Sequence, residues 1–330
     1  MKIAIVGAGS WGTSFGRYLS LQGHDVSVYG RNPEKIALIN QSRKNEQYLP
    51  GIELPQNLRF FSEIEPVIEG AQLLFNAISS QYIRKQYAEF AGKIPADIPI
   101  INLSKGIELT SLKLIHQVFA EILPDNPYAA LSGPSHAEEV AIDMPTTLVV
   151  ASLDDELNHQ IQNLSSRTIR IYRSNDLLGV EIGGALKNII ALAVGVSDGV
   201  GFGDNTQAAI MTRGMAEIMR MGSALGANTE TFLGLSGFGD LIVTCTSHHS
   251  RNRRCGILIG QGLSVQQASE QVGMVVEGIR TMEAAYALAQ QMGIEMPLTQ
   301  ALYDIIHEGA SVSETITELM ERDFKQEFNL

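Results

Sequence analysis

The sequence is poor in cysteine, in basic residues and in long apolar runs. Only two of its 330 residues are cysteines, Cys245 and Cys255, and they form neither a CxxC pair nor a His–Cys spacing typical of metal sites. This scarcity excludes a disulfide framework and a zinc finger. We therefore expect reduced thiols, no metal site and a cytoplasmic location.

The apolar runs are too short for export or membrane insertion. The first of them, residues 3–6, ends at a glycine, whereas the apolar region of a signal peptide needs at least about 7 residues. No uninterrupted apolar stretch approaches the ~20 residues that cross a bilayer as a helix. The longest candidate follows Lys187 and is interrupted at Ser197-Asp198-Gly199. These lengths predict no signal peptide and no membrane span.

Positive charge is also in short supply. The chain has 24 Lys and Arg residues against 36 Asp and Glu, a net charge of −12. An acidic protein of this kind has little general affinity for nucleic acid or an anionic membrane. A small anionic substrate therefore needs a local basic site, because the overall field repels it.

The chain contains enough apolar residues for folded domains. It is 45% hydrophobic and 18% charged, and its length predicts roughly two domains at about 150 residues each. In the first half, short β-rich runs alternate with helical patterns, which is typical of a mostly parallel sheet covered on both faces. The predicted strands span residues 2–6, 25–29, 58–61, 72–78, 98–103, 128–132, 146–152 and 168–172. The helical patterns between them include residues 11–21, 33–41, 80–92 and 111–122.

The β pattern stops near Ser174. Glycine-rich turns such as residues 197–205 and 235–240 join the helical runs that follow. These runs span residues 175–196, 206–225, 251–260, 278–292 and 298–307. We therefore expect an α/β protein, with a doubly wound Rossmann-type domain over residues 1–174 and an all-helical substrate domain over residues 175–330.

Residues 7–12, GAGSWG, match the pattern G-x-G-x-x-G. The hexapeptide alone is weak, but here it follows a predicted strand and opens a predicted helix, the context of a dinucleotide-binding loop. Gly7 permits the tight turn, Gly9 lets a pyrophosphate approach the backbone, and Gly12 lets helix and strand pack closely. The free N–H groups of the helix start then bind the phosphates. The alternative is an ordinary glycine-rich turn.

The end of the second predicted strand bears on the choice of cofactor. NAD-specific folds carry an acidic residue there for the ribose 2′-hydroxyl, whereas this chain has Gly30-Arg31-Asn32. The guanidinium of Arg31 suits a 2′-phosphate, which favours NADP(H) while NAD(H) stays open. The alternative is a solvated loop arginine.

Lys187 lies in an apolar helical run, EIGGALKNIIALAVGV, at residues 181–196. Burying an ammonium group is unfavourable unless it is paired or its pKa falls. A desolvated lysine can accept a hydroxyl proton near neutral pH, and Gly183 and Gly184 on adjoining faces indicate close approach of a helix or a ligand. The alternative is a lysine whose head reaches solvent along the helix. If Lys187 is a base, Lys187→Met is expected to leave the fold intact, or even more stable.

Other polar residues accompany this lysine in the sequence. Asp240, in a glycine turn, is a candidate to orient Lys187 or bind a substrate hydroxyl, or else a plain turn residue. Ser250 is a predicted N-cap. Its hydroxyl, together with Arg251 and the free N–H groups of the helix start, predicts an anion site. For Arg253 and Arg254 we favour a solvated basic face. Residues 131–136, LSGPSH, predict a further loop-to-helix entry.

Seven motifs together carry a family resemblance. Spread over nearly the whole chain, in order, are GAGSWGT, NLSKG, LSGPSHAEEV, EIGGALKN, GFGDLIVTC, SRNRRCG and VVEG. In this combination the chain resembles the bacterial NAD(P)-dependent glycerol-3-phosphate dehydrogenases. His136, where relatives usually carry an aromatic residue, and the pair His248-His249 depart from the pattern.

The resemblance implies roles for individual residues. Lys187 matches the proton acceptor, and Lys105 matches a lysine that touches both cofactor and substrate. The positions that match substrate-binding residues are Lys105, Gly133, Ser135, Lys187, Asp240, Ser250, Arg251 and Asn252. The positions that match cofactor-binding residues, besides Gly7, Gly9 and Gly12 of the glycine loop, are Ser10, Trp11, Arg31, Lys105, Ala137, Arg251, Val275 and Glu277.

The resemblance also implies a reaction. It is the interconversion of sn-glycerol 3-phosphate and dihydroxyacetone phosphate, with hydride moving between the substrate's C2 and nicotinamide C4 across the cleft between the domains. The resemblance further implies that the product feeds glycerophospholipid synthesis and that the enzyme forms a homodimer.

Two other readings stay open. One is a two-domain dehydrogenase of the 3-hydroxyacid or 6-phosphogluconate type, in which the helix lysine and its partner asparagine are usually separated, whereas Lys187 and Asn188 are adjacent here. The other is a nucleotide-sensing protein without catalysis, which the presence of Lys187 and Asp240 disfavours. A turnover assay separates them.

Overall fold

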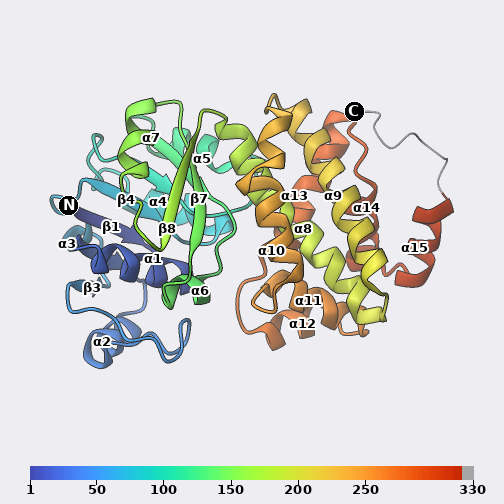
Figure 1. Cartoon of the computed structure of the whole chain (residues 1–330), viewed down its shortest axis with the longest axis horizontal. Coiled ribbons are helices and arrows are strands. Elements are labelled where there is room, and N and C mark those ends of the chain that lie inside the picture. The colour runs from blue at the N-terminus through green and yellow to red at the C-terminus, as the bar shows by residue number, and fades with distance from the viewer. Residues whose placement is uncertain (322–330) are drawn as a thin grey trace. The chain divides into compact units, whose positions relative to one another are not determined.

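The structure, a computed structural model, describes residues 1–321. Residues 322–330 of the predicted helical domain therefore lie outside the described residues. The contacts divide the chain into two compact units (Figure 1). The first unit holds Met1–Lys105 and Leu114–Val180, and the second holds Gly106–Lys113 and the chain from Glu181 onward.

The first unit is built on one eight-stranded sheet with the order β3-β2-β1-β4-β5-β6-β7-β8. All neighbouring strands are parallel except β6 and β7, which are antiparallel. The strands are β1 (Lys2–Val6), β2 (Asp25–Tyr29), β3 (Leu58–Phe61), β4 (Leu73–Asn76), β5 (Ile100–Asn102), β6 (Tyr128–Ser132), β7 (Thr146–Ala151) and β8 (Ile169–Ser174). Each lies on one of the predicted strands, so the predicted doubly wound, mostly parallel sheet is confirmed.

Alternation along the strands places a hydrophobic cluster on each face of the sheet. Ile3 and Ile5 of β1 belong to one cluster, and Ala4 and Val6 belong to the other, because successive strand side chains point to opposite faces. The helices that contribute to the first cluster are α1 (Ser10–Leu21), α2 (Pro33–Ser42), α6 (Ala137–Ala141) and α7 (Asp155–Gln162). Those that contribute to the second are α3 (Glu65–Ile68), α4 (Ile83–Phe90) and α5 (Ile115–Ile122).

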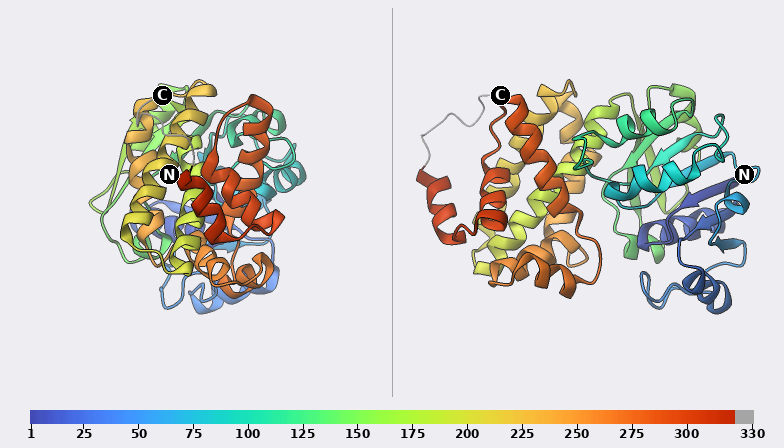
Figure 2. Two further views of the ribbon diagram at one scale, coloured as in Figure 1. Left: turned by 90° about the vertical axis from the view of Figure 1, so that its right-hand side faces the viewer. Right: turned by 180° about the vertical axis from the view of Figure 1, so that it is seen from behind.

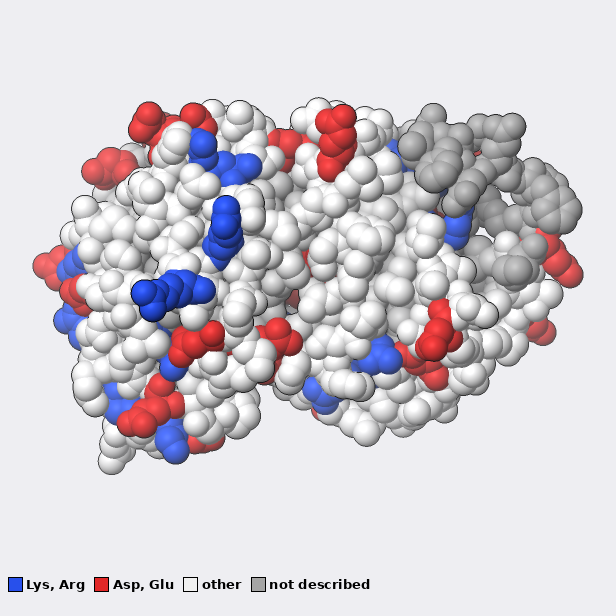
Figure 3. All heavy atoms as spheres, in the orientation of Figure 1, with Lys and Arg blue, Asp and Glu red and all other residues white. Residues whose placement is uncertain are grey.

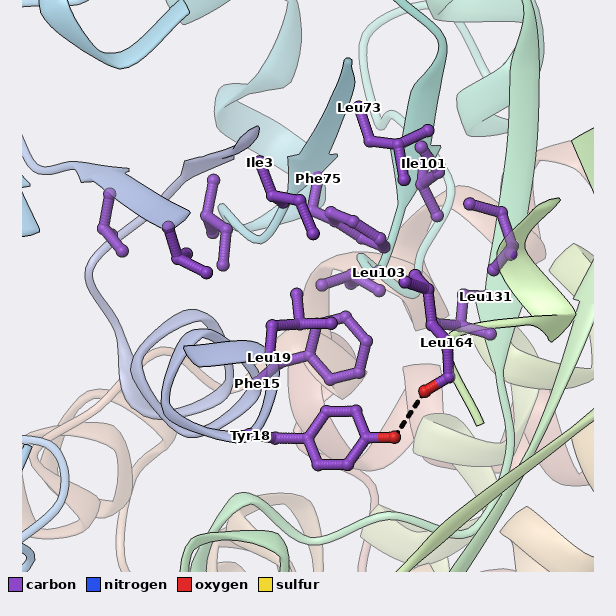
Figure 4. Packing of buried hydrophobic residues seen from close by; sticks show 14 of the residues in the cluster. Ile3, Phe15, Tyr18, Leu19, Leu73, Phe75, Ile101, Leu103, Leu131 and Leu164 are labelled. Carbon is purple, nitrogen blue, oxygen red and sulfur yellow. Dashed lines mark hydrogen bonds between the residues drawn. The ribbon is translucent and has the colours of Figure 1, made fainter. Parts of the chain in front are cut away.

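Aromatic packing fixes α1 against the sheet (Figure 4). The ring of Phe15 lies 5.2 Å from that of Phe75 on β4 and 5.6 Å from that of Tyr18. The hydroxyl of Tyr18 donates a hydrogen bond to the carbonyl of Leu164. All three rings are almost completely buried, so the position of α1, and of the glycine loop before it, is set by the core.

The second unit is helical, and residues 181–321 contain no strand (Figure 2). Its longer helices are α8 (Leu177–Val200), α9 (Asp204–Ala224), α10 (Asp240–Thr246), α11 (Arg251–Gly260), α12 (Val265–Val272), α13 (Glu277–Met292), α14 (Pro297–Tyr303) and α15 (Val312–Glu321). Short 3₁₀ or π turns occur at η1 (Ser80–Tyr82) in the first unit and at η2 (Thr229–Leu233), η3 (Leu235–Gly239) and η4 (Asp304–Glu308) in the second. The predicted helix over residues 298–307 is divided between α14 and η4.

Helix α8 continues through Ser197-Asp198-Gly199, where the sequence predicts its end. The reason is tertiary packing: a Cβ on Gly199 would lie 2.2 Å from the carbonyl oxygen of Ile257 in α11. Gly195 faces α11 in the same way, because a Cβ there would lie 2.1 Å from the carbonyl oxygen of Arg253. On α11, Gly256 has its Cβ position 2.2 Å from the carbonyl oxygen of Leu192. On α11, Gly260 has its Cβ position 2.3 Å from the carbonyl oxygen of Val196, so glycines spaced by four on both helices bring the two backbones into contact.

Helix α8 is also the one described helix long and apolar enough to span a membrane. Its most apolar window has a mean hydropathy of 1.7, but 89% of that window is buried inside the structure. This burial is what a core helix requires, since a helix that is apolar all round must be covered on every side.

A buried carboxylate, Glu217 on α9, caps the start of α14. It accepts hydrogen bonds from the backbone N–H of Thr299 at 3.2 Å and from the Thr299 hydroxyl at 2.9 Å, and also from the N–H of Leu298. Burial raises the pKa of Glu217 from 4.5 to about 7, against the hydrogen bonds and the charge of Arg220, which lower it.

Because this pKa is raised in the folded state, Glu217 makes its full contribution to the free energy of unfolding below about pH 4.5. That contribution is lost as the pH rises through 7. The loss amounts to about 3 kcal/mol. Chemical denaturation of wild type and Glu217→Gln from about pH 5 to 8 measures it, since other titrating groups cancel in the difference. We expect the stability advantage of wild type to shrink as the pH rises. A difference that is independent of pH would contradict a titrating Glu217.

Candidate active site

The glycine loop lies between β1 and α1, as predicted. Gly7 has a φ of +123°, and a Cβ there would lie 2.8 Å from the backbone of Ala77. A Cβ on Gly12 would lie 1.9 Å from the carbonyl oxygen of Gly7, so both positions require glycine. A Cβ on Gly9, in contrast, meets nothing within 4 Å. The backbone at Gly9 therefore borders open space.

The start of α1 leaves its N–H groups available to an anion. Gly9 is the N-cap and supplies no side-chain hydrogen bond, and the first N–H groups of a helix have no partner within the helix. Together with the helix dipole, these groups form an anion site. The open space at Gly9 and this uncapped start fit the pyrophosphate of a nicotinamide dinucleotide.

Three further predicted cofactor residues lie in the glycine loop itself or after the next strand. Ser10 is the first residue of α1, and Trp11 is partly buried, with its ring 5.6 Å from that of Phe15. Arg31 is exposed directly after β2. The next residue, Asn32, caps α2 by accepting a hydrogen bond from the N–H of Lys35 at 2.9 Å. The backbone of Arg31 thus lies on a short turn that ends at a capped helix start.

The structure brings Lys105, Gly133 and Ser135 together at one carbonyl group. The Lys105 ammonium donates to the carbonyl oxygen of Gly133 at 3.1 Å, and the Ser135 hydroxyl donates to the same oxygen at 2.9 Å. Gly133 has a φ of +132°, which favours glycine. Ala137 begins α6, and its carbonyl oxygen accepts from the hydroxyl of Ser14 on α1 at 2.8 Å.

Two buried asparagines that the sequence analysis missed hold the residue before Lys105. The side-chain amide of Asn76 donates to Asn102 Oδ1 at 2.8 Å and to Ser104 Oγ at 2.9 Å. The amide of Asn102 donates to the carbonyl oxygen of Ser104 at 3.0 Å. The sequence signal that could have identified them is an asparagine towards the end of each of two apolar runs. The ends of parallel strands meet at one sheet edge, and α/β proteins bind their ligands at that edge.

In the second unit, Lys187 of α8 is buried and ion-paired. Only 6% of its surface is exposed, and its ammonium pairs with the carboxylate of Asp240, the first residue of α10. The ammonium also donates to Thr244 Oγ1 at 2.7 Å, and that hydroxyl donates to the carbonyl oxygen of Asp240 at 2.6 Å. The alternative of a lysine head in solvent is therefore wrong, and Asp240 orients Lys187. The sequence analysis did not identify Thr244.

Gly183 explains how α10 comes so close to α8. A Cβ on Gly183 would lie 2.7 Å from the carbonyl oxygen of Ser236 in η3. The sequence left open whether a helix or a ligand approaches this glycine. In the structure, the neighbour is another helical segment of the chain. Because η3 leads directly into α10, this contact places Asp240 beside Lys187.

The start of α11 carries the predicted anion-binding residues. Ser250 is the N-cap, as predicted, and accepts from the N–H of Arg253 at 3.3 Å. Arg251 is exposed, whereas Asn252 is buried. The side chain of Asn252 donates to Asn188 Oδ1 at 2.9 Å and accepts from the N–H of Gly278 at 2.9 Å.

These bonds of Asn252 connect three helices. Asn188 follows Lys187 on α8, and Gly278 follows Glu277, the first residue of α13. Val275, which precedes α13, is 49% exposed. The predicted substrate residues at the start of α11 and the predicted cofactor residues at the start of α13 are therefore held together within one unit.

The structure corrects the prediction for Arg253. Its guanidinium binds Asp198 of α8, with Nε 2.9 Å and an Nη 2.6 Å from the carboxylate, and the two side chains are 16% and 10% exposed. Gln207 also donates to Asp198. Arg253 thus anchors the start of α11 to α8, a role that requires the continuation of α8 past the predicted end. Arg254 is exposed, as predicted.

Other charged groups and the two thiols lie outside this cluster. On the face drawn in Figure 3, acidic and basic side chains occur on both units. Among residues 1–321, no three His, Cys, Asp or Glu side chains form a group that would hold a metal ion.

Cys245 and Cys255 are free and buried, and burial raises the pKa of the Cys245 thiol to about 12. That thiol is therefore protonated at neutral pH and unreactive.

Comparisons with known proteins agree with the resemblance seen in the sequence. Residues 2–158 match the profile of the N-terminal domain of NAD-dependent glycerol-3-phosphate dehydrogenase, and residues 176–317 match that of its C-terminal domain. "Glycerol-3-phosphate dehydrogenase [NAD(P)+]" from Clostridium perfringens is 49% identical over 99% of both chains. The protein of that name from Clostridium tetani is 48% identical over 98% of this chain and 93% of its own.

A solved structure extends the agreement to three dimensions. Glycerol-3-phosphate dehydrogenase from Coxiella burnetii superposes with a TM-score of 0.94 at 36% identity, covering 97% of this chain and 98% of its own. Both the sequence profiles and this superposition span the two units. The chain belongs to the NAD-dependent glycerol-3-phosphate dehydrogenase family.

Proposed function

We propose that the protein interconverts sn-glycerol 3-phosphate and dihydroxyacetone phosphate with NAD(H) or NADP(H), and so supplies glycerol 3-phosphate for glycerophospholipid synthesis. The observation that carries this proposal is the buried Lys187–Asp240–Thr244 cluster. A buried ammonium held by a carboxylate and a hydroxyl is a positioned proton donor and acceptor. The nucleotide-sensing alternative requires no such group.

Lys187 is the acid–base residue in this proposal. In oxidation its unprotonated amine takes the proton from the C2 hydroxyl of glycerol 3-phosphate, and in reduction its ammonium returns a proton to the same oxygen. The glycine loop would hold the dinucleotide, whose nicotinamide would supply or accept the hydride at C2. Asp240 and Thr244 fix the direction of the Lys187 head and offset the unfavourable burial of its charge.

The substrate phosphate is bound at the start of α11. The N–H groups of the first turn, the hydroxyl of Ser250 and the guanidinium of Arg251 supply donors and positive charge there. Asn252 and Asn188 hold this turn beside Lys187. The family resemblance assigns Lys105 of the first unit to substrate and cofactor as well.

The direct test is a turnover assay of the purified protein. We expect oxidation of NADPH and NADH with dihydroxyacetone phosphate as substrate, and no comparable rate with 3-oxoacids. In the opposite direction we expect reduction of NADP⁺ and NAD⁺ with glycerol 3-phosphate, and no comparable rate with 6-phosphogluconate. Binding of a cofactor without turnover of dihydroxyacetone phosphate would favour the nucleotide-sensing alternative and refute the proposal.

The proposed preference for NADP(H) rests on Arg31. Arg31→Ala is expected to raise KM for NADPH about 10- to 100-fold, the value of a charge-assisted hydrogen bond, and to change KM for NADH little. Arg59→Ala is a matched control, because Arg59 is also exposed in the first unit and pairs with Asp25 at 2.7 Å. Equal changes for both cofactors would show that Arg31 does not bind the 2′-phosphate.

We also propose a homodimer and a cytoplasmic location. The homodimer follows from the family resemblance, and the scarcity of cysteine supports the cytoplasmic location. Sedimentation of the purified protein tests the homodimer directly, and a monomer at assay concentrations would contradict it.

A further inference from the structure

Residues 43–54, which follow α2, form a closed loop. The N–H of Leu54 donates to the carbonyl oxygen of Arg43 at 2.9 Å, and Lys44 and Glu53 form an antiparallel bridge. The Arg43 guanidinium donates to the carbonyl oxygen of Leu58 at 2.8 Å. Leu49 and Leu54 are 1% and 2% exposed. The two ends of the loop are therefore joined, and its apolar side chains anchor it in the core.

Asn45 connects this loop to the glycine loop. It is 2% exposed, and its side-chain amide donates to the carbonyl oxygen of Ala8 at 3.0 Å and to Thr13 Oγ1 at 2.8 Å. The backbone carbonyl oxygen of Asn45 accepts a hydrogen bond from the N–H of Leu49 at 2.8 Å. One buried amide thus holds a residue on each side of Gly9.

The position of these two bonds matters because the loop that they hold is rich in glycine. Glycine loses more conformational freedom on ordering than any other residue, and three of the six residues at 7–12 are glycines. Gly9, the N-cap, provides no side chain that would fix the turn. Ala8 and Thr13 lie before and after the segment that borders the proposed pyrophosphate site.

We propose that Asn45 is a positioning residue that holds the glycine loop in its binding conformation before the cofactor arrives. This inference rests on the proposed cofactor site. A loop that is already ordered loses less entropy on binding, which tightens affinity without any direct contact. Ala8 and Thr13 flank the proposed pyrophosphate site and not the 2′-phosphate, which is where NADPH and NADH differ. The gain in affinity from Asn45 is therefore the same for both cofactors.

The test compares Asn45→Ala with Asn40→Ala in the full-length protein. Asn40 also bridges backbone groups in the first unit, donating to the carbonyl oxygen of Phe60 at 2.8 Å and accepting from its N–H at 3.2 Å, but it makes no bond to the glycine loop. Fluorescence titration gives Kd for NADPH and NADH directly. We expect Asn45→Ala to raise both values about tenfold, and Asn40→Ala to change them less than about twofold. We expect the melting temperature to fall in both variants.

A second pair of variants keeps the test decisive if Asn45→Ala folds poorly. Thr13→Ser retains the hydroxyl that accepts from Asn45 and is expected to bind both cofactors like wild type. Thr13→Val removes it and is expected to raise both Kd values about threefold to fivefold. Steady-state kinetics of the variants should show a raised KM for either cofactor, with kcat at saturating cofactor unchanged.

Several outcomes would overturn the inference. Equal Kd values for Asn45→Ala and Asn40→Ala would reduce Asn45 to a structural residue, and a loss confined to NADPH would place its effect at the 2′ end. Wild-type protein that binds neither cofactor would instead refute the proposed function itself. If Asn45→Ala cannot be purified folded, identical Kd values for Thr13→Ser and Thr13→Val refute the inference.

Discussion

Lys187→Met is expected to lower kcat by about 10²- to 10⁴-fold, the usual contribution of a positioned proton donor or acceptor. Methionine fills a similar volume and keeps the apolar stem but has no proton to transfer. The glycine loop belongs to the first unit, so NADPH and NADH are expected to bind with unchanged Kd. The measurements are steady-state kinetics in both directions and a fluorescence titration of each cofactor.

The stability of this variant is expected to differ from what the sequence alone predicts. The sequence indicates that removing a buried ammonium is harmless or stabilising, but Asp240 is 1% exposed and forms an ion pair with Lys187. Removing one member of a buried ion pair costs about 3–5 kcal/mol, because the other charge stays buried. The double variant Lys187→Met/Asp240→Asn removes both charges and is expected to recover most of that stability.

The double variant also separates catalysis from folding. If Lys187 transfers the proton, restoring stability does not restore turnover, and both variants stay slow. A folded Lys187→Met enzyme with near-normal kcat would refute the proposed role of the lysine. Recovery of turnover in the double variant would show that the single variant was slow only because it was unfolded.

Arg251→Ala is expected to lower kcat/KM for dihydroxyacetone phosphate by about 2–3 kcal/mol, or roughly 30- to 150-fold. The loss reflects a charge-assisted hydrogen bond to the phosphate in a protein whose net charge of −12 repels anions. Activity with unphosphorylated dihydroxyacetone, already poor, is expected to change far less.

Arg254→Ala is the matched control for Arg251. Arg254 lies three residues further along α11 and is also exposed, so its removal changes the net charge equally without touching the proposed anion site. We expect its kcat/KM for dihydroxyacetone phosphate to stay within about twofold of wild type. Proportional losses with both substrates in Arg251→Ala would show that Arg251 is not the phosphate anchor.

The strands and the glycine loop were predictable because their signals are local. An apolar run such as residues 2–6, followed by GAGSWG, determines a strand, a tight turn and a helix start within about a dozen residues. The steric need for glycine at Gly12 arises within the same short segment, where its Cβ position meets the carbonyl oxygen of Gly7, whereas that at Gly7 arises from the distant backbone of Ala77. The N-cap at Ser250 is equally local.

The partners of buried charges were not predictable in the same way. Lys187 and Asp240 are 53 positions apart, and only the close approach of η3 to Gly183 brings them together. The pair Arg253–Asp198 depends on α8 running past a sequence that favours a turn, which the packing of Gly199 on α11 overrides. Asn45 carries no motif at all, and its role follows from a loop closed by backbone bonds.

The pH dependence of glycerol 3-phosphate oxidation, measured at saturating cofactor, tests the proton-transfer role of Lys187 most directly. Oxidation requires the unprotonated amine, so kcat of the wild-type enzyme is expected to rise with pH until Lys187 has lost its proton, and then to level off. The Lys187→Met/Asp240→Asn enzyme is expected to lack this rise and plateau, because the titrating group is gone. The same ascending limb in both enzymes would contradict the assignment of Lys187 as the group that takes the proton.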